Sequence, residues 1–290
     1  MQKPKSALLL IAGSLLTLFS VAASAEWGMN LRPGVTPVTQ EVFDLHMYVL
    51  YFVYAIGAAV TGVILWSVVF HRKSRGAEAA TWHEHLGVEI VWTIVPFIIL
   101  GFLAVPATKT LLKMEDTTSD VDVTIKATGY QWMWSYEYMG SKDFDDEGIN
   151  FYSKISDQDN EVRQLDSGMD PVELNLENYL YDVDKVVYVP VNKKVRILTT
   201  AVDVIHSWWV PDLAGKKDAI PGFINELWFK AEKTGTFRGS CAELCGKDHA
   251  FMPIVVKVVT AEEYKAWVAE QKGSSSAAAV SDNNAVALAQ

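Results

Sequence analysis

The sequence has only two cysteines, Cys241 and Cys245, among its 290 residues. Neither belongs to a C-x-x-C-H motif, so no covalently attached haem is expected. The sequence also lacks a P-loop, a glycine-rich dinucleotide fingerprint, a Ser-His-Asp spacing and an internal repeat, which argues against the protein classes that those patterns mark. Acidic residues outnumber basic ones by 35 to 25, for a net charge of -10, so a nucleic-acid partner is not expected.

The two cysteines belong to a short segment that is rich in soft metal ligands. Its pattern is C-x3-C-x3-H-x2-M, and it ends with His249 and Met252. A second imidazole, His206, precedes this segment in an apolar and aromatic run. Thiolate and thioether ligands favour copper over harder ions, so the segment indicates a copper site.

Other interpretations of the same pattern compete with copper. In an oxidising compartment the two cysteines could form a disulfide. Structural zinc sites usually use two histidines after the cysteine pair, whereas one follows here and Met252 is a poor zinc ligand. A mononuclear blue-copper site would leave one thiolate unused. Two copper ions sharing both sulfurs would use every ligand, with one histidine for each ion, Met252 as a weak axial ligand of one, and a backbone carbonyl for the other.

The N-terminal residues predict export. Residues 1–25 combine a basic start, a short apolar core and the ending Ala23-Ser24-Ala25, which is typical of a cleaved secretory signal peptide. A signal anchor is the alternative interpretation. An extended periplasmic lead-in is expected over residues 26–44, because Pro33, Gly34 and Pro37 interrupt regular structure there.

Two apolar stretches predict a membrane hairpin. Residues 45–70 and 88–112 are each long enough to cross a bilayer core of about 30 Å. The loop over residues 71–87 begins with a cluster of basic residues, and the positive-inside rule places it in the cytoplasm. We therefore expect a protein of the bacterial inner membrane, with its N-terminus and its main domain on the periplasmic side.

The rest of the chain predicts an all-β domain over residues 113–272. Short runs rich in β-branched and aromatic residues are separated by Gly, Pro and Asp, a pattern that favours a β-sandwich or small barrel. These predicted strands are Val121–Tyr138, Val186–Ala201, Asn225–Ala231 and Met252–Thr260. A capping-box pattern that begins at Thr260 predicts a short helix, and the Ser- and Ala-rich residues 273–290 predict a disordered tail.

Three further features have both a structural and a functional interpretation. The run Gly129–Tyr138 places five aromatic residues at period two on one predicted strand face, as core packing or as a partly exposed path for electrons. Glu89 opens the second span, where a carboxylate can interact with the helix N-terminus or collect protons. The acidic run Asp143–Glu147 is a solvated loop or a surface that attracts a basic partner.

Together these segments resemble subunit II of cytochrome c oxidase, over nearly the whole mature chain. The resemblance is carried by the segment from Cys241 to Met252, Val204–Trp208, Val210-Pro211 with Lys216, Asp218–Gly222, Gly129–Tyr138, and Glu89 ahead of Trp92–Pro96. It implies a cupredoxin-like Greek-key domain that holds the dinuclear copper centre CuA. It also implies assembly with the haem–copper subunit I and other oxidase subunits in the membrane lipid. The complex would take electrons from cytochrome c, reduce oxygen to water and translocate protons.

The resemblance also implies roles for the ligands. Cys241 and Cys245 would bridge the two copper ions, His206 and His249 would be their terminal ligands, and Met252 would be the axial ligand of one ion.

The remaining roles are likewise implied by the resemblance. The backbone carbonyl of Glu243 would be the second axial ligand, and its side chain would reach a Mg²⁺ ion shared with subunit I. Trp132 would be the residue at which electrons enter, Glu89 would stand at the mouth of a proton channel, and Asp184 and Asp203 would dock cytochrome c.

The sequence leaves two other functions open. A membrane-anchored copper carrier would need the copper ligands but would not need Trp132, Glu89 or Glu243. A nitrous oxide reductase has a similar copper loop, but it is soluble and has a further catalytic domain.

The sequence departs from the family pattern in places. The segment over residues 140–171 is longer and more acidic than in compact mitochondrial members, and Ala214-Gly215 alters a turn.

Overall fold

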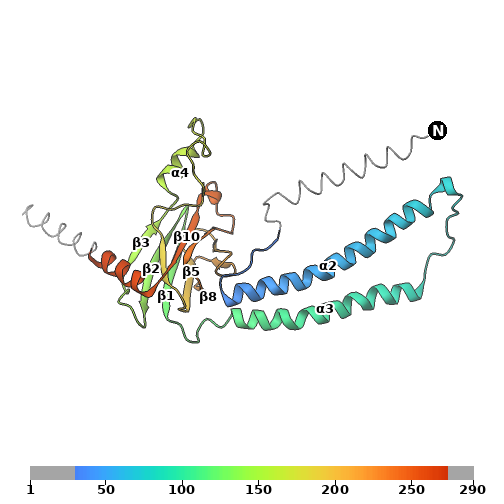
Figure 1. The fold of residues 1–290 in the computed structure, drawn as a ribbon, viewed down its shortest axis with the longest axis horizontal. Coiled ribbons are helices and arrows are strands. Elements are labelled where there is room, and N and C mark those ends of the chain that lie inside the picture. Colours follow the sequence, from blue (N-terminus) through green and yellow to red (C-terminus); the bar gives the residue numbers. More distant parts are fainter. Residues whose placement is uncertain (1–29, 274–290) are drawn as a thin grey trace, which may run out of the picture. The chain divides into compact units, whose positions relative to one another are not determined.

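The membrane part is a pair of long helices. The computed structural model describes residues 30–273, so the expected signal peptide and the tail beyond residue 273 lie outside the described residues. Within these residues the helical elements begin with α2 (Pro37–Phe70) and the single turn η1 (Lys73–Arg75), and α3 (Leu86–Met114) follows (Figure 1). Both α2 and α3 are long and apolar enough to span a membrane. An ion pair between Lys113 and Glu41 joins them.

Helix α2 begins earlier than the sequence indicated. The oxygen of Thr36 accepts a hydrogen bond from the Thr39 N–H, and the Thr39 hydroxyl accepts one from the Thr36 N–H. Pro37 occupies the first turn, where its missing N–H costs nothing. The expected extended lead-in is therefore wrong over residues 37–44, because this capping box starts the helix there. With 34 residues, α2 is about 51 Å long and exceeds the bilayer core of about 30 Å.

Beyond α3, the described residues form a β domain of three sheets. Its strands are β1 (Val123–Tyr130), β2 (Met133–Ser141), β3 (Asn150–Ser153), β4 (Val187–Pro190), β5 (Val195–Ala201), β6 (His206–Trp208), β7 (Lys217–Ala219), β8 (Asn225–Phe229), β9 (Gly235–Ser240) and β10 (Pro253–Val259). The strand orders are β3-β2-β1-β5-β8, β4-β10-β9 and β6-β7. The pairs β1–β5 and β4–β10 are parallel, and the other pairs are antiparallel. The two larger sheets enclose one core, as expected for a sandwich.

The aromatic run is a hairpin rather than one strand. The single strand predicted over Val121–Tyr138 is wrong, because β1 ends at Tyr130 and pairs directly with Met133 at the start of β2. Gln131 and Trp132 therefore form the connecting turn. A two-residue turn preserves the alternation of aromatic residues, so the periodicity alone did not reveal the break.

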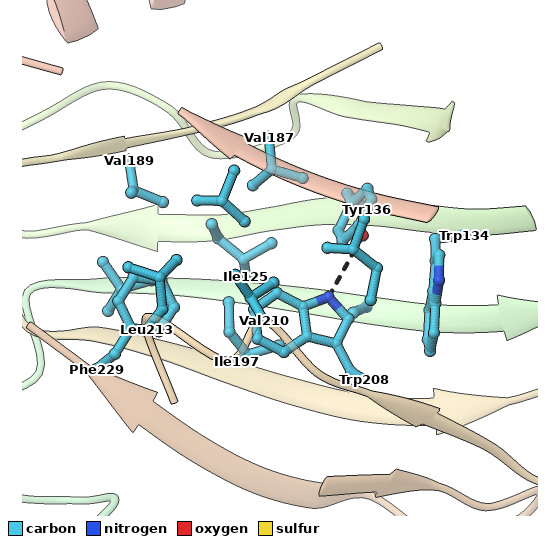
Figure 2. Close-up of a cluster of buried hydrophobic side chains, with 14 of the residues drawn as sticks. Ile125, Trp134, Tyr136, Val187, Val189, Ile197, Trp208, Val210, Leu213 and Phe229 are labelled. Atoms are coloured by element: carbon cyan, nitrogen blue, oxygen red, sulfur yellow. Dashed lines mark hydrogen bonds between the residues drawn. The ribbon is translucent and has the colours of Figure 1, made fainter. Parts of the chain in front are cut away.

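The core packs aromatic rings between the sheets. Trp134, Tyr136 and Tyr138 of β2 are each at most 1% exposed, so for these three residues the core interpretation is correct. The indole N–H of Trp208 donates to the hydroxyl of Tyr136 at 3.3 Å, and the ring stacks on Phe229 (Figure 2). Burying a large apolar side chain stabilises a fold by about 1.5–3 kcal/mol. This cluster therefore anchors β6 firmly.

A C-terminal helix over residues 261–273 closes the domain. Its predicted capping box is present: the Glu263 N–H donates to the Thr260 hydroxyl at 3.2 Å, and the Thr260 N–H donates to the Glu263 carboxylate at 2.9 Å. Tyr264 and Trp267 are buried in the core, and Trp267 stacks on Tyr188 with ring centroids 5.1 Å apart.

Candidate metal centre

The proposed ligands come from β6 and from the loop between β9 and β10. His206 is the first residue of β6, and Cys241 follows directly after β9. Cys241 donates its backbone N–H to the Met252 carbonyl at 3.0 Å, which joins the two ends of the loop. Ala242 donates to the Ser207 carbonyl at 2.9 Å and ties the loop to β6. These backbone contacts bring the distant histidine to the loop.

The two thiols lie side by side, and each faces its own imidazole. The sulfur atoms of Cys241 and Cys245 are 3.9 Å apart. The Cys241 sulfur is 3.8 Å from Nδ1 of His206, and the Cys245 sulfur is 3.5 Å from Nδ1 of His249. A disulfide would require about 2.05 Å between the sulfurs, and both cysteines are free. The disulfide alternative is therefore not formed.

The donor atoms suit a soft metal, and the site that they form is buried from water. The ligand atoms of His206, Cys241 and Cys245 all lie within 4.8 Å of one another, and all three residues are buried. The Glu243 carbonyl lies 3.3 Å from the Cys241 sulfur, and Met252 is 1% exposed. Two thiols, two imidazoles, a thioether and a carbonyl match the ligands that copper takes.

The ring of His206 fits a space that only glycine leaves open. A Cβ atom on Gly129 of β1 would lie 2.7 Å from Cδ2 of His206, closer than side-chain carbons approach. Trp134 of β2 contacts the same ring edge-on, with centroids 6.0 Å apart. The neighbouring strands therefore fix the plane of the imidazole.

Asp203 holds the other nitrogen of His206. Its Oδ1 lies 2.9 Å from Nε2 of the ring, and its Oδ2 accepts the Gln131 N–H at 2.8 Å. Burial would raise the pKa of Asp203, but hydrogen bonds from His206 and from two backbone N–H groups outweigh it and lower the pKa. A carboxylate on Nε2 leaves Nδ1 free to bind a metal.

The two thiols differ in how readily they ionise in the metal-free chain. Burial would raise the pKa of Cys241, but its hydrogen bond with His206 and two backbone hydrogen bonds lower it below the ordinary value. Burial, followed by the proximity of Cys241, raises the pKa of Cys245 to about 12. Metal binding must therefore release a proton from Cys245, as is usual when a thiol becomes a ligand.

Trp132 lies against the metal loop. Its indole N–H donates to the Cys245 carbonyl at 3.2 Å, and the Gln131 side chain donates to the same oxygen at 2.7 Å. The Lys247 ammonium lies 5.5 Å from the centroid of the Trp132 ring. The half-exposed indole thus connects the surface to the backbone of a proposed ligand.

The other candidate residues lie elsewhere. Glu243 is exposed on the metal loop. Asp184 accepts the Lys154 N–H at 2.8 Å, which ties two surface segments together. Glu89 accepts the His85 N–H at 3.2 Å and so caps the start of α3, which supports the structural interpretation of its position.

Sequence reasoning missed three contacts of this centre. It assigned Asp203 to partner docking alone, and it gave no role to Gln131 or Gly129. The spacing Asp-x-x-His is a usable signal for the first, because a metal-bound histidine commonly donates its second N–H to a carboxylate. The close approach of Gly129 to His206 depends on tertiary structure and has no local signal.

Comparison with known proteins identifies the family of this chain. The family model for the periplasmic domain of cytochrome c oxidase subunit II matches residues 123–259, and the model for its transmembrane domain matches residues 24–110. Cytochrome c oxidase subunit 2 of Arabidopsis thaliana is 36% identical over 259 residues, which are 88% of this chain and 94% of that protein. The subunit 2 of Cereibacter sphaeroides is 37% identical over 252 residues, 85% of this chain and 81% of that protein.

A solved structure of a bacterial relative is also similar. The periplasmic domain of subunit II of cytochrome oxidase (CoxB) from Bradyrhizobium japonicum is 44% identical, with a TM-score of 0.44 over 53% of this chain and 96% of that chain. The periplasmic family domain binds copper, and His206, Cys241 and Cys245 form a candidate site for it here. The chain belongs to the cytochrome c oxidase subunit II family: it is a two-span membrane protein with a cupredoxin-like periplasmic domain, and it functions as a subunit of cytochrome c oxidase.

Proposed function

We propose that this domain holds a dinuclear copper centre. Cys241 and Cys245 would hold the two ions through their sulfurs, together with His206 and His249 through Nδ1. Met252 would add its thioether as a weak ligand. This assignment rests on two adjacent sulfurs that each face a separate imidazole. The Cys241 sulfur lies 3.8 Å from Nδ1 of His206, and the Cys245 sulfur lies 3.5 Å from Nδ1 of His249. A single ion would not use this set fully.

The chain's contribution is to hold these ligands rigidly in a dry site. When bound, two copper ions that share two thiolates supply one-electron exchange with little change of structure. Asp203 orients the His206 ring, and the carbonyl of Glu243 would supply a further oxygen ligand. Because Cys241, Cys245 and Met252 are all at most 5% exposed, water is excluded from the sulfurs.

We assign the reception of electrons from cytochrome c to Trp132. The indole is half-exposed, and its N–H contacts the backbone of Cys245. The carboxylates of Asp184 and Asp203 add to a chain of net charge -10, which attracts a basic donor and accelerates encounter. Asp203 therefore has two roles, one toward His206 and one toward the donor.

We place the copper domain on the periplasmic side of the bacterial inner membrane, against subunit I. The exposed carboxylate of Glu243 offers one oxygen ligand to a Mg²⁺ ion at that interface. Mg²⁺ takes several oxygen ligands, so the others come from subunit I and from water. Copper held in this domain would pass single electrons toward the haem of subunit I, the subunit in which oxygen would be reduced to water and protons translocated.

We assign Glu89 to the start of a proton path. Glu89→Gln keeps an oxygen that can accept the His85 N–H, so the helix cap survives while the carboxylate is lost. Proton translocation by the assembled oxidase should therefore fall while α3 remains folded. Unchanged turnover and proton translocation would remove Glu89 from the path.

The whole assignment is tested by purifying this chain from native membrane together with the proteins bound to it. We expect a multi-span, haem-containing partner to co-purify, two copper ions per chain, and oxidation of reduced cytochrome c. Trp132→Phe should slow that oxidation without loss of copper. A copper-binding chain without a haem partner would instead support the copper-carrier alternative.

A further inference from the structure

The segment over residues 156–163, which we call the brace, is fixed to the domain independently of the metal loop. It contains α4 (Asp157–Val162), and the Asp159 N–H donates to the hydroxyl of Ser156 at 3.1 Å. The Asp159 side chain is 3% exposed and accepts the Leu180 N–H at 3.1 Å. Val162 is 5% exposed. The brace is therefore a defined surface element.

Arg163 at the end of the brace contacts the metal loop in two ways. Its Nη1 donates to Oδ1 of Asp248 at 3.3 Å, with side chains only 18% and 23% exposed. Its guanidinium carbon lies 4.2 Å from the centroid of the Phe251 ring. Asn160 accepts from Nε at 2.8 Å and fixes the plane of the guanidinium. A planar guanidinium can stack on a ring and pair with a carboxylate at once, which an ammonium does less well.

These two contacts flank a proposed copper ligand. Asp248 precedes His249, and Phe251 ends the single turn η2 (His249–Phe251) directly before Met252. The Phe251 N–H donates to the Asp248 carbonyl at 2.9 Å, so the turn is closed between the two residues that Arg163 holds. Arg163 thus restrains both ends of the turn that places Nδ1 of His249 3.5 Å from the Cys245 sulfur.

We infer that Arg163 is a positioning residue for the metal centre, and that the brace keeps His249 and Met252 at their ligand positions. This inference rests on the proposed copper site, and it assigns a function to the part of the long segment 140–171 that the family resemblance left unexplained. The partial burial of the ion pair matters, because a pair shielded from solvent is screened less by salt.

The test compares four variants of the assembled, full-length oxidase, one of which is the Arg163→Ala/Asp248→Asn double variant. Arg163→Ala removes both contacts, and Asp248→Asn removes only the charge partner. Lys154→Ala is the matched control, because Lys154 pairs with Asp157 at the opposite end of α4, at 2.9 Å, and has no hydrogen bond, ion pair or ring contact with the metal loop among the described residues. The measurements are the rate at which a Cu(I) chelator removes copper, the copper electron paramagnetic resonance spectrum, and the thermal unfolding midpoint.

We expect Arg163→Ala to lose copper about tenfold faster than wild type, which corresponds to about 1.4 kcal/mol. Its resonance spectrum should change, because the His249 geometry relaxes. The rate of copper loss from Asp248→Asn should lie between the rates of wild type and Arg163→Ala. The double variant should lose copper no faster than Arg163→Ala, because both changes remove the same ion pair. Lys154→Ala should match wild type.

Equal rates and spectra for Arg163→Ala and Lys154→Ala would overturn the inference. So would a change in unfolding midpoint alone, with spectrum and copper loss unaltered. If Arg163→Ala fails to assemble, Asp248→Asn decides: faster copper loss supports the brace, and the wild-type rate overturns it. A wild-type oxidase without a two-copper centre would contradict the proposed function itself, and that result is visible before any variant is made.

Discussion

His206 is held through both nitrogens of its ring: Nε2 lies 2.9 Å from Oδ1 of Asp203, and Nδ1 lies 3.8 Å from the Cys241 sulfur. We predict that Asp203→Ala weakens copper binding by about 10–100-fold, the usual effect of losing the carboxylate behind a metal-bound histidine. Asp203→Asn keeps an oxygen acceptor and should cost less. The measurement is a copper titration of the full-length chain in detergent against a chelator of known affinity.

The same two variants separate the two roles of Asp203. Both remove the carboxylate that would attract cytochrome c, so both should raise the KM for the donor. Only Asp203→Ala should also release copper readily. Equal copper affinity in the two variants and wild type would show that the contact with His206 does not support the metal.

Gly129 should be required for copper binding rather than for folding of the sheet. In Gly129→Ala the new methyl group would lie 2.7 Å from His206, so the ring must move away from Cys241. We predict loss of copper with retained β-sheet structure, measured by metal analysis and circular dichroism. Gly273→Ala is the control, because among the described residues nothing beyond its chain neighbours and its own helix backbone lies within 4 Å of its added Cβ. A Gly129→Ala chain that binds copper normally would show that the His206 ring does not need the space beside Gly129.

Met252 should influence the electronic state of the site more than its stability. Met252→Leu keeps the volume of a side chain that is 1% exposed, so we expect a loss of less than about 1.5 kcal/mol in unfolding free energy. Loss of the axial thioether should shift the reduction potential and the visible spectrum. Potentiometry of the assembled oxidase checks this. An unchanged potential and spectrum would mean that Met252 is only a core residue.

Copper should stabilise the β domain. A metal that binds only the folded state stabilises it by about 2.7 kcal/mol at a concentration about a hundredfold above its Kd. We therefore predict a higher unfolding midpoint for the copper-loaded chain than for the chelated chain, measured by calorimetry. Cys245→Ser should reduce this difference strongly, because it removes one shared sulfur. An identical midpoint with and without copper would contradict a preformed site.

The candidate ligands could be proposed from the sequence because most of them lie close together along the chain. Cys241, Cys245, His249 and Met252 lie within one loop, and their residue types and spacing already favour copper. His206 could be added because it stands in a recognisable segment. The capping box at Thr260 was equally local, and the structure confirms it.

Other features were predicted wrongly or missed for physical reasons: two were misread from a local pattern, and one depends on a contact between distant residues. The hairpin at Gln131-Trp132 was hidden because a two-residue turn leaves the aromatic alternation intact. The early start of α2 was missed because Pro37 was interpreted as a helix breaker, although proline suits the first turn. The contact of Arg163 with Asp248 joins residues 85 positions apart, and no pattern along the chain marks it.

The most direct measurement of the central claim is electron paramagnetic resonance of the full-length, copper-loaded chain in detergent. One unpaired electron shared equally by two copper nuclei gives a seven-line hyperfine pattern, and we predict that pattern together with two copper ions per chain and a purple colour. A four-line pattern from a single copper, or tight binding of colourless zinc in its place, would contradict the paired-sulfur centre.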